Sequence, residues 1–291
     1  MESVLHRESP TLSGSAVAPF EEKSPPAATG ERRARGKSRA VGRAFLVLPA
    51  YNEAESLPSL FRRLAATDFL TRLDVTVCVV DDGSADDTAA IAEAGFPGLK
   101  VKLFKHPKNM GLGQAMQTGI AEATQLAWED DVVIAMDADD THDVNLIPDL
   151  VSAIQDGADI AIASRFVEGG CDKTAPPFRR LLSRGASVVF KTVFPLKNVR
   201  DFTCGYRAYR VSLLKKANRH WGERLVEESG FACMMELLLK LRHWSPVIAE
   251  VPMVLRYDRK ESASKLKLFR TLGQYLKLAL RDRLTPAPRH A

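Results

Sequence analysis

Two aspartates one residue apart are the side chains in this sequence whose types and spacing point most directly to chemistry. Asp137 and Asp139 flank Ala138, directly after the apolar run of residues 132–136. Carboxylate oxygens suit Mg²⁺ or Mn²⁺, and a diphosphate can supply the remaining oxygen ligands. Like charges this close repel each other unless a cation is present. We therefore expect Asp137 and Asp139 to hold a divalent metal, Mg²⁺ or Mn²⁺, against a diphosphate.

Polar clusters follow two other apolar runs in the same way. Residues 49–53 read Pro-Ala-Tyr-Asn-Glu, so Tyr51 offers an aromatic face beside the carboxylate of Glu53. This combination is suited to a nucleobase and its ribose. Asp81 and Asp82 follow a second run, and we expect one of them to cap the next helix and the other to accept from the nucleoside. Asp86 and Asp87 are alternative caps of the same helix.

Several basic side chains are spaced along the second half of the chain. Arg165 follows another apolar run, and Arg207, Arg210, Arg259 and Lys265 come later. In a cleft that contains a metal, such cations can neutralise a departing diphosphate. We expect this chemistry around Arg165.

The elements that must position these residues follow from the hydrophobic pattern. Apolar runs alternate with amphipathic stretches, which is typical of a mainly parallel sheet covered on both faces by helices. In open sheets of this kind, ligands bind beyond the carboxyl ends of the strands. The polar clusters therefore belong to one site on an α/β, Rossmann-like fold. The predicted strands are residues 44–48, 75–80, 101–104, 132–136 and 159–163.

Composition and charge divide the chain into three parts. The 291 residues are 45% hydrophobic and 26% charged, which is ordinary for a globular protein and excludes collagen-like and wholly disordered classes. The formal net charge is +5, yet both ends are basic and the middle is acidic. Residues 1–42 are predicted to be a disordered basic arm, 43–258 the catalytic domain, and 259–291 a basic amphipathic helix and tail.

Targeting signals and cysteine pairs are not visible in the sequence. No apolar run approaches the length of about 20 residues that spans a bilayer, and the four cysteines are far apart. We expect a cytoplasmic protein with reduced thiols that binds no nucleic acid. The amphipathic C-terminal segment adds an alternative, peripheral contact with an anionic membrane on its cytoplasmic face. In a second interpretation its apolar stripe packs on the domain.

Taken in order, these motifs resemble those of family 2 glycosyltransferases with the GT-A fold, and within them dolichyl-phosphate and polyprenyl-phosphate mannosyltransferases. The resemblance covers about residues 43–270. The sequences that carry it are LPAYNE (48–53), VVDDGSADDT (79–88), GLGQA (111–115), MDADDTH (136–142), SRF (164–166), SRGAS (183–187), DFTCGYRAYR (201–210), GFACMME (230–236), EVP (250–252) and Arg259 to Lys265.

The resemblance implies roles for individual residues. It places Asp137 and Asp139 on the metal, with Asp139 and Arg165 among the catalytic residues. Residues 183–187 resemble the acceptor side. The residues implied in binding the nucleotide sugar are Pro49, Tyr51, Glu53, Val80, Asp82, Asp137, Ala138, Asp139, Arg165, Arg259 and Lys265. Asp140 departs from the family pattern, in which Leu usually follows the second aspartate.

The activity that we expect is an inverting, metal-dependent transfer of a mannose- or glucose-type sugar. The donor is a nucleotide sugar, and the preferred acceptor is a polyprenyl phosphate, whose ionised oxygen needs no strong base. A soluble hydroxyl acceptor is the alternative, and it would require a base such as Glu236 or Glu228. A non-catalytic protein that binds nucleotide sugars is the alternative from another class. A nucleotidyltransferase fits less well, because Pro-Ala-Tyr-Asn-Glu stands where its glycine-rich loop would follow the first strand.

Overall fold

The structure is a computed structural model, and it describes residues 42–171, 185, 187–188, 190–192, 194, 196–255, 273–275, 277–278 and 281. The chain separates into two units, residues 1–34 and 35–291, and every described residue belongs to the second unit. The predicted arm lies outside the described residues apart from Gly42, and so does most of the C-terminal segment.

Seven strands form a single sheet in the order β3-β2-β1-β4-β6-β5-β7. β6 runs antiparallel to its neighbours β4 and β5, and the remaining pairs are parallel. The mainly parallel sheet predicted from the apolar runs is therefore confirmed. The strands are β1 (Arg43–Ala50), β2 (Asp74–Asp81), β3 (Lys100–Lys105), β4 (Val132–Ala135), β5 (Ile160–Ser164), β6 (Arg207–Arg210) and β7 (Ile248–Pro252).

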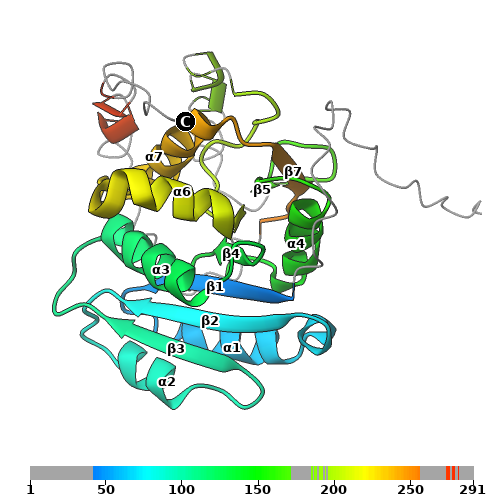
Figure 1. Cartoon of the computed structure of the whole chain (residues 1–291). Helices are drawn as coiled ribbons and strands as arrows, with labels where there is room; N and C mark the ends of the chain where they lie inside the picture. Colours follow the sequence, from blue (N-terminus) through cyan, green and yellow to red (C-terminus); the bar gives the residue numbers. More distant parts are fainter. Residues whose placement is uncertain are drawn as a thin grey trace, which may run out of the picture. The chain divides into compact units, whose positions relative to one another are not determined.

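Helices connect the strands and cover the sheet. In Figure 1, α1 is seen behind β2 and β3, whereas α3 lies in front of β1. α4 packs against β5 and β6, and α3 also contacts α6 and α7. The α-helices are α1 (Ser56–Ala65), α2 (Thr88–Ala94), α3 (Leu112–Leu126), α4 (Ile147–Gln155), α6 (Val211–Trp221) and α7 (Ala232–Leu241). Short 3-10 helices occupy Asp68–Thr71, Val144–Leu146, Gly222–Arg224 and Arg242–Trp244.

The core explains why these strands read as continuous apolar runs. Residues 44–50 and 132–135 are all buried, because helices cover both faces of the sheet. A glycine brings α3 close to the strands. A Cβ built on Gly119 would lie 2.3 Å from Val47 Cγ1 and 3.2 Å from Val80 Cγ2, so any larger residue would push the helix away. None of the described helices has the length and apolar character needed to cross a membrane.

The strand directions bring the predicted polar clusters to one edge. β1, β2 and β4 are parallel to each other, and β5 is parallel to them because β6 is antiparallel to both β4 and β5. Their carboxyl ends therefore meet where Tyr51, Asp82, Asp137 and Arg165 follow the strands. This edge is the candidate site.

Candidate active site

The two predicted metal ligands follow the carboxyl end of β4. Asp137 and Asp139 are both of intermediate burial, whereas Ala138 between them is only 2% exposed. This alternation puts both carboxylates on the side of the chain that solvent reaches. Among the residues that the structure describes, no three His, Cys, Asp or Glu side chains form a cluster that could hold a metal. Two carboxylates are donors of the kind that a hard cation prefers, and a diphosphate could supply its other ligands.

The orientation of Asp139 is fixed by the residue two positions further on. The Thr141 hydroxyl donates to Asp139 Oδ1 at 2.7 Å, and the Thr141 N–H donates to the same oxygen at 3.3 Å. Thr141 is itself buried, with 5% of its surface exposed. One carboxylate oxygen of Asp139 is thus held by the protein.

The loop after β1 is joined to the loop after β2. The Glu53 N–H donates to Thr88 Oγ1 at 2.8 Å, and the Asn52 N–H donates to Ser84 Oγ at 2.9 Å. Ala85 returns a bond from its N–H to Asn52 Oδ1 at 2.9 Å. Tyr51 and Glu53, the residues expected at the nucleoside, therefore lie on a shared support with residues 84–88. Their contact with a nucleotide stays a prediction.

Asp82, which directly follows β2, is buried and accepts several hydrogen bonds. Its carboxylate accepts from the N–H groups of Met110 and Gly111 at 2.9 and 2.8 Å, and Oδ1 lies 2.7 Å from His106 Nδ1. Asp82 is only 3% exposed. These contacts support the loop that precedes α3. The contact of Asp82 with a nucleoside remains a prediction.

The expectation that Asp81 or Asp82 caps the next helix is wrong. Asp81 Oδ1 accepts from the Ser84 N–H at 3.1 Å, which closes the tight turn through Gly83. Of the alternative caps, Asp86 accepts from the Thr88 N–H at the start of α2, at 3.1 Å, whereas the side chain of Asp87 makes no capping bond. The turn through Gly83 separates the aspartate pair from the helix, so neither carboxylate reaches its first turn.

Gly111 and Gly113 permit close packing at the start of α3. Gly111 has φ +93°, and a Cβ built on Gly113 would lie 1.7 Å from the carbonyl oxygen of Glu228. The Gly113 N–H donates to Ser229 O at 3.3 Å. The start of α3 is therefore built directly against residues 228–229.

Pro49 and Val80, both expected in the nucleotide site, lie beneath the strand ends. Both are buried, and Val80 packs towards Gly119 of α3. They pair with each other one residue before the ends of β1 and β2, and their contact with a ligand remains a prediction.

Arg165 at the end of β5 forms a bidentate ion pair with Asp201. Arg165 Nε and Nη2 each donate to Asp201 at 2.7 Å, and Nη2 also lies 2.7 Å from Thr203 Oγ1. Burial would raise the pKa of Asp201, but the charge and hydrogen bonds of Arg165 outweigh burial and hold the pKa below its usual value. Arg165 is thus fixed at the sheet edge, and its contact with a diphosphate stays a prediction.

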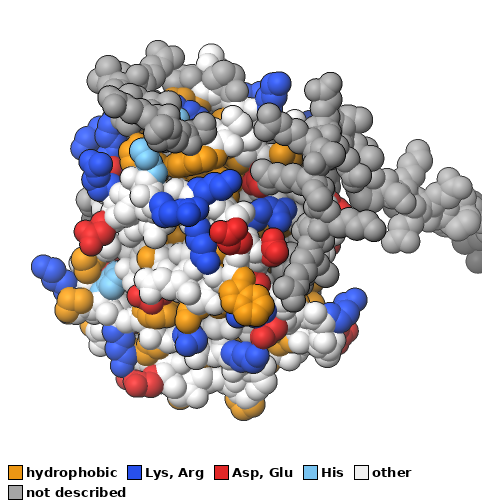
Figure 2. Space-filling view, viewed as in Figure 1, with side chains coloured by type: hydrophobic (Ala, Val, Ile, Leu, Met, Phe, Trp, Pro, Cys, Tyr) orange, Lys and Arg blue, Asp and Glu red, His pale blue; other side chains and the backbone are white. Residues whose placement is uncertain are grey.

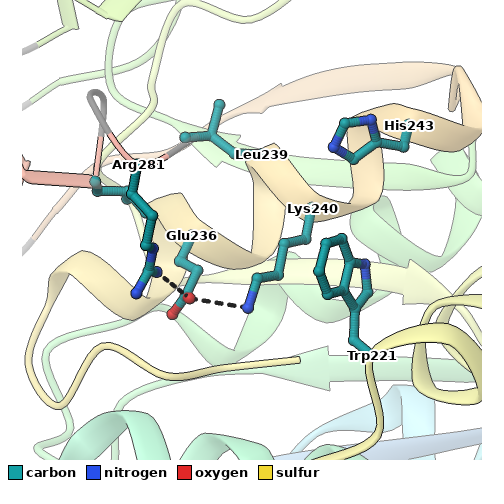
Figure 3. Close-up of a pocket in the computed structure, with 7 residues that line it drawn as sticks. Trp221, Glu236, Leu239, Lys240, His243 and Arg281 are labelled. Carbon is teal, nitrogen blue, oxygen red and sulfur yellow. Dashed lines mark hydrogen bonds and ion pairs between the residues drawn. The ribbon is translucent and has the colours of Figure 1, made fainter. Parts of the chain in front are cut away.

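Glu236, the candidate base, is fully buried on α7. Its Oε2 accepts from the N–H groups of Glu227 and Glu228 at 2.7 Å each. Its Oε1 pairs with Arg281 at 2.5 Å and with Lys240 at 3.0 Å, as Figure 3 shows. The two backbone contacts hold residues 227–228, which pack against the start of α3. The role of Glu236 as a base remains a prediction.

The small cavity beside Glu236 is not a sugar pocket. It has a volume of about 20 Å³, which is room for about one water molecule. Its lining residues come from α6, α7, the 3-10 helix Arg242–Trp244 and the C-terminal segment, and they include Trp221, His243 and Arg281 (Figure 3).

Some residues of the predicted site cannot be placed, and others were not foreseen. Arg259, Lys265 and residues 183–184 lie outside the described residues. Asp201 and His106 have contacts with Arg165 and Asp82 that the sequence analysis did not anticipate. Asp201 could have been recognised because it begins the motif of residues 201–210. His106 is a single histidine after β3, and nothing in the sequence around it indicates its contact with Asp82.

Comparisons with known proteins agree with the motifs. The sequence model described as Glycosyl transferase family 2 matches residues 45–217. A dolichol-phosphate mannosyltransferase of Pyrococcus furiosus is 34% identical over 233 residues, which are 80% of this chain and 61% of that protein. A polyprenol monophosphomannose synthase of Mycolicibacterium smegmatis is 30% identical over 230 residues, which are 78% of this chain and 82% of that protein.

Solved structures confirm the predicted GT-A fold. Glucosyl-3-phosphoglycerate synthase from Mycobacterium tuberculosis, in complex with Mn²⁺, uridine diphosphate and glucosyl-3-phosphoglycerate, superposes with a TM-score of 0.59. The superposition covers 88% of this chain and 85% of that one, at 20% identity. At this identity the likeness extends to the fold alone.

Proposed function

Because the chain belongs to glycosyl transferase family 2 and is a glycosyltransferase, we propose that it transfers a sugar of the mannose type from a nucleotide sugar to a polyprenyl phosphate. The observation that carries the proposal is the pair Asp137 and Asp139 on one side of the chain at the carboxyl edge of the sheet. The relatives named as mannosyltransferases support the sugar and the lipid phosphate. Because this chain spans 61% of the Pyrococcus furiosus relative, that whole protein's activity is carried over only as a proposal.

In the proposed reaction, an oxygen of the acceptor phosphate attacks the anomeric carbon from the face opposite the leaving group. The bond between that carbon and the diphosphate oxygen breaks, and its electron pair leaves with the nucleoside diphosphate. A divalent cation on Asp137 and Asp139 would supply positive charge for this leaving group. Thr141 orients Asp139 through two hydrogen bonds, and Arg165, held by Asp201, adds positive charge at the same edge.

A soluble acceptor that reacts through a hydroxyl group is the second candidate. It is favoured by the structural neighbour bound to glucosyl-3-phosphoglycerate, which is 20% identical to this chain. The lipid-phosphate proposal is preferred because the dolichol-phosphate and polyprenol enzymes are 34% and 30% identical to this chain, compared with 20% for the structural neighbour. A hydroxyl acceptor would require a carboxylate base, for which Glu236 and Glu228 are the candidates, whereas a lipid phosphate would not.

We propose further that the protein meets its acceptor through peripheral contact with an anionic membrane. Part of the C-terminal segment packs on the domain, since Leu278 is 2% exposed and the Tyr275 ring contacts the Phe190 ring edge-on at 5.0 Å. Figure 2 shows Lys and Arg side chains gathered over α6, where Lys216 and Arg219 are exposed. Each basic residue near an anionic surface contributes about 1 kcal/mol, weakened by salt.

The transfer itself is tested by incubating GDP- and UDP-sugars with polyprenyl phosphate and Mn²⁺ or Mg²⁺, and by measuring nucleotide release. Release that depends on the lipid and on the metal, and that Asp139→Asn abolishes without unfolding the protein, would support the proposal. Turnover that is unaffected by Asp139→Asn would contradict it. Sedimentation with anionic and neutral vesicles at low and high salt tests the membrane contact, and equal binding to both kinds would exclude it.

A further inference from the structure

A single arginine of α1 holds the turn that follows the two candidate metal ligands. Arg63 Nη1 donates to the carboxylate of Asp140 and, at 3.2 Å, to the Asp140 carbonyl oxygen. Arg63 Nη2 donates to the carbonyl oxygen of His142 at 3.2 Å. From one turn earlier on α1, the Ser59 hydroxyl donates to Asp140 Oδ2 at 2.9 Å. Four hydrogen bonds from α1 therefore converge on Asp140 and His142, the residues on either side of Thr141.

The backbone of this turn requires such support. Asp140 has φ +56°, in the left-handed region that residues with a side chain rarely adopt and that Asp and Asn tolerate best. The side chain of Asp140 is 12% exposed and that of Arg63 is 24% exposed, so solvent screens their attraction only in part. Charge-assisted bonds of this kind are about twice as strong as neutral ones.

The four hydrogen bonds from Ser59 and Arg63, called the clamp below, hold the backbone on both sides of Thr141. Thr141 lies between the two carbonyl groups that Arg63 holds, and both hydrogen bonds from Thr141 go to Asp139 Oδ1. A second anchor lies beyond the turn, where the Tyr206 hydroxyl donates to the carbonyl oxygen of Asp143 at 3.2 Å. A shift of Asp140 would therefore move Thr141 and rotate the carboxylate of Asp139.

We propose that Arg63 and Asp140 are a positioning pair that holds Asp139 in the orientation in which it binds a divalent cation. The inference rests on the proposed role of Asp137 and Asp139 in binding the metal, and it adds α1 to the machinery of the site. Neither Arg63 nor Asp140 needs to touch the metal or the substrate. Their effect reaches the site through the backbone of residues 140–142 and through Thr141.

Binding of Mn²⁺ alone tests the inference without any turnover. The Mn²⁺ dissociation constant is measured by the loss of the free-ion signal in electron paramagnetic resonance, for the wild type, Asp140→Asn and Arg63→Gln. Loss of a residue that supports a metal ligand weakens metal binding about 10- to 100-fold, and we expect about 10-fold for each variant. Asn keeps the left-handed backbone accessible, so Asp140→Asn should remain folded.

Two further variants make the result specific. Arg62→Gln removes the same charge from the neighbouring, exposed position of α1, and it should leave Mn²⁺ affinity unchanged. The double variant Arg63→Gln with Asp140→Asn should bind Mn²⁺ no more weakly than either single variant, because each change breaks the same clamp. Arg63→Lys keeps the charge but loses the two-pronged geometry, and an intermediate affinity is expected.

The outcomes separate this inference from the proposed function. Mn²⁺ binding that Asp139→Asn abolishes, together with unchanged affinity in Asp140→Asn and Arg63→Gln, would overturn the positioning pair and leave the metal site standing. Wild-type protein that binds Mn²⁺ no more tightly than Asp139→Asn does, both without and with added GDP, would overturn the metal site and the pair with it. A 10-fold loss in both clamp variants, but not in Arg62→Gln, is the result we expect.

Discussion

Replacing Asp201 by Asn should destabilise the protein strongly, because it removes the charge that compensates Arg165. Asp201 is fully buried and accepts from Arg165 Nε and Nη2 at 2.7 Å each. It also accepts from the N–H groups of Thr203 and Cys204 at 3.2 and 3.1 Å. Asn can retain part of the backbone bonds, but its amide group cannot accept from the second prong of the guanidinium.

The magnitude follows from the burial of the two partners. Breaking a buried ion pair by removing one partner costs about 3–5 kcal/mol. The side chain of Arg165 is 13% exposed, so water can reach part of the stranded charge, and we expect the lower end, about 3 kcal/mol. With a urea slope of about 3 kcal/mol per M, the unfolding midpoint should fall by about 1 M.

Urea unfolding followed by circular dichroism measures this shift. Asp74→Asn is the matched control, because it breaks the exposed pair with Lys100, whose side chains are 42% and 68% exposed. An exposed pair contributes about 1 kcal/mol or less, so the control should move the midpoint only slightly. An Asp201→Asn midpoint within error of the control would refute the reasoning that this pair is a buried support of the sheet edge.

The pH dependence of the free energy of unfolding tests the role of Asp201 independently. The pKa of Asp201 lies below its ordinary value of 3.8 in the folded state, since the attraction and hydrogen bonds of Arg165 outweigh burial. The stabilisation is therefore complete above pH 3.8 and is lost as the pH falls through the lower folded-state pKa. The difference in free energy of unfolding between wild type and Asp201→Asn should be constant from pH 7 to 5 and shrink below pH 4. A difference that stays constant down to pH 2 would contradict this assignment.

Three further predictions concern packing, thiol chemistry and the C-terminal segment. Gly113→Ala should lower the free energy of unfolding by about 1–3 kcal/mol, seen as a lower melting temperature, because the new Cβ would meet the Glu228 carbonyl. Gly42→Ala is the control, since open space surrounds Gly42, and it should leave the melting temperature unchanged. Iodoacetamide at pH 8 should label the partly exposed Cys171 long before Cys204, since burial raises the pKa of the Cys204 thiol to about 12. Mass spectrometry of the labelled peptides measures the two rates, and equal rates would contradict this prediction. Arg281→Gln should cost about 1 kcal/mol in chemical unfolding, a value discounted because the side chain is 34% exposed, and an unchanged midpoint would argue against a stabilising contact with α7.

The first five strands could be predicted from the sequence because each is an apolar run. β1 ends at Ala50, two residues beyond the predicted end, because Pro49 and Ala50 still pair with Val80 and Asp81 of β2. β6 and β7 were missed. β6 consists of four residues with arginines at both ends, yet Arg207 is buried because its guanidinium donates to the carbonyl groups of Phe202 and Met234. Such compensation depends on tertiary contacts that no periodicity reveals.

The positions of the candidate site residues were easier to predict than their supports. Strand ends followed by Asp, Tyr or Arg indicated the edge on which Asp137 and Arg165 lie. The partners Asp201 and Arg63 come from distant parts of the chain, and only the folded backbone brings them to Arg165 and Asp140. The glycines before α3 show the same limit, because the need for Gly113 arises from the carbonyl of Glu228, 115 residues further along.

Partition of the transferred sugar between two acceptors tests the central claim most directly. The protein is incubated with a radiolabelled nucleotide sugar and Mn²⁺ in the presence of equal amounts of polyprenyl phosphate and 3-phosphoglycerate, and the label is counted after extraction into organic solvent. We predict label in the organic phase that disappears with EDTA and with Asp139→Asn. Label that stays in the aqueous phase as a glycosylated phosphoglycerate, or that persists in Asp139→Asn, would contradict the account.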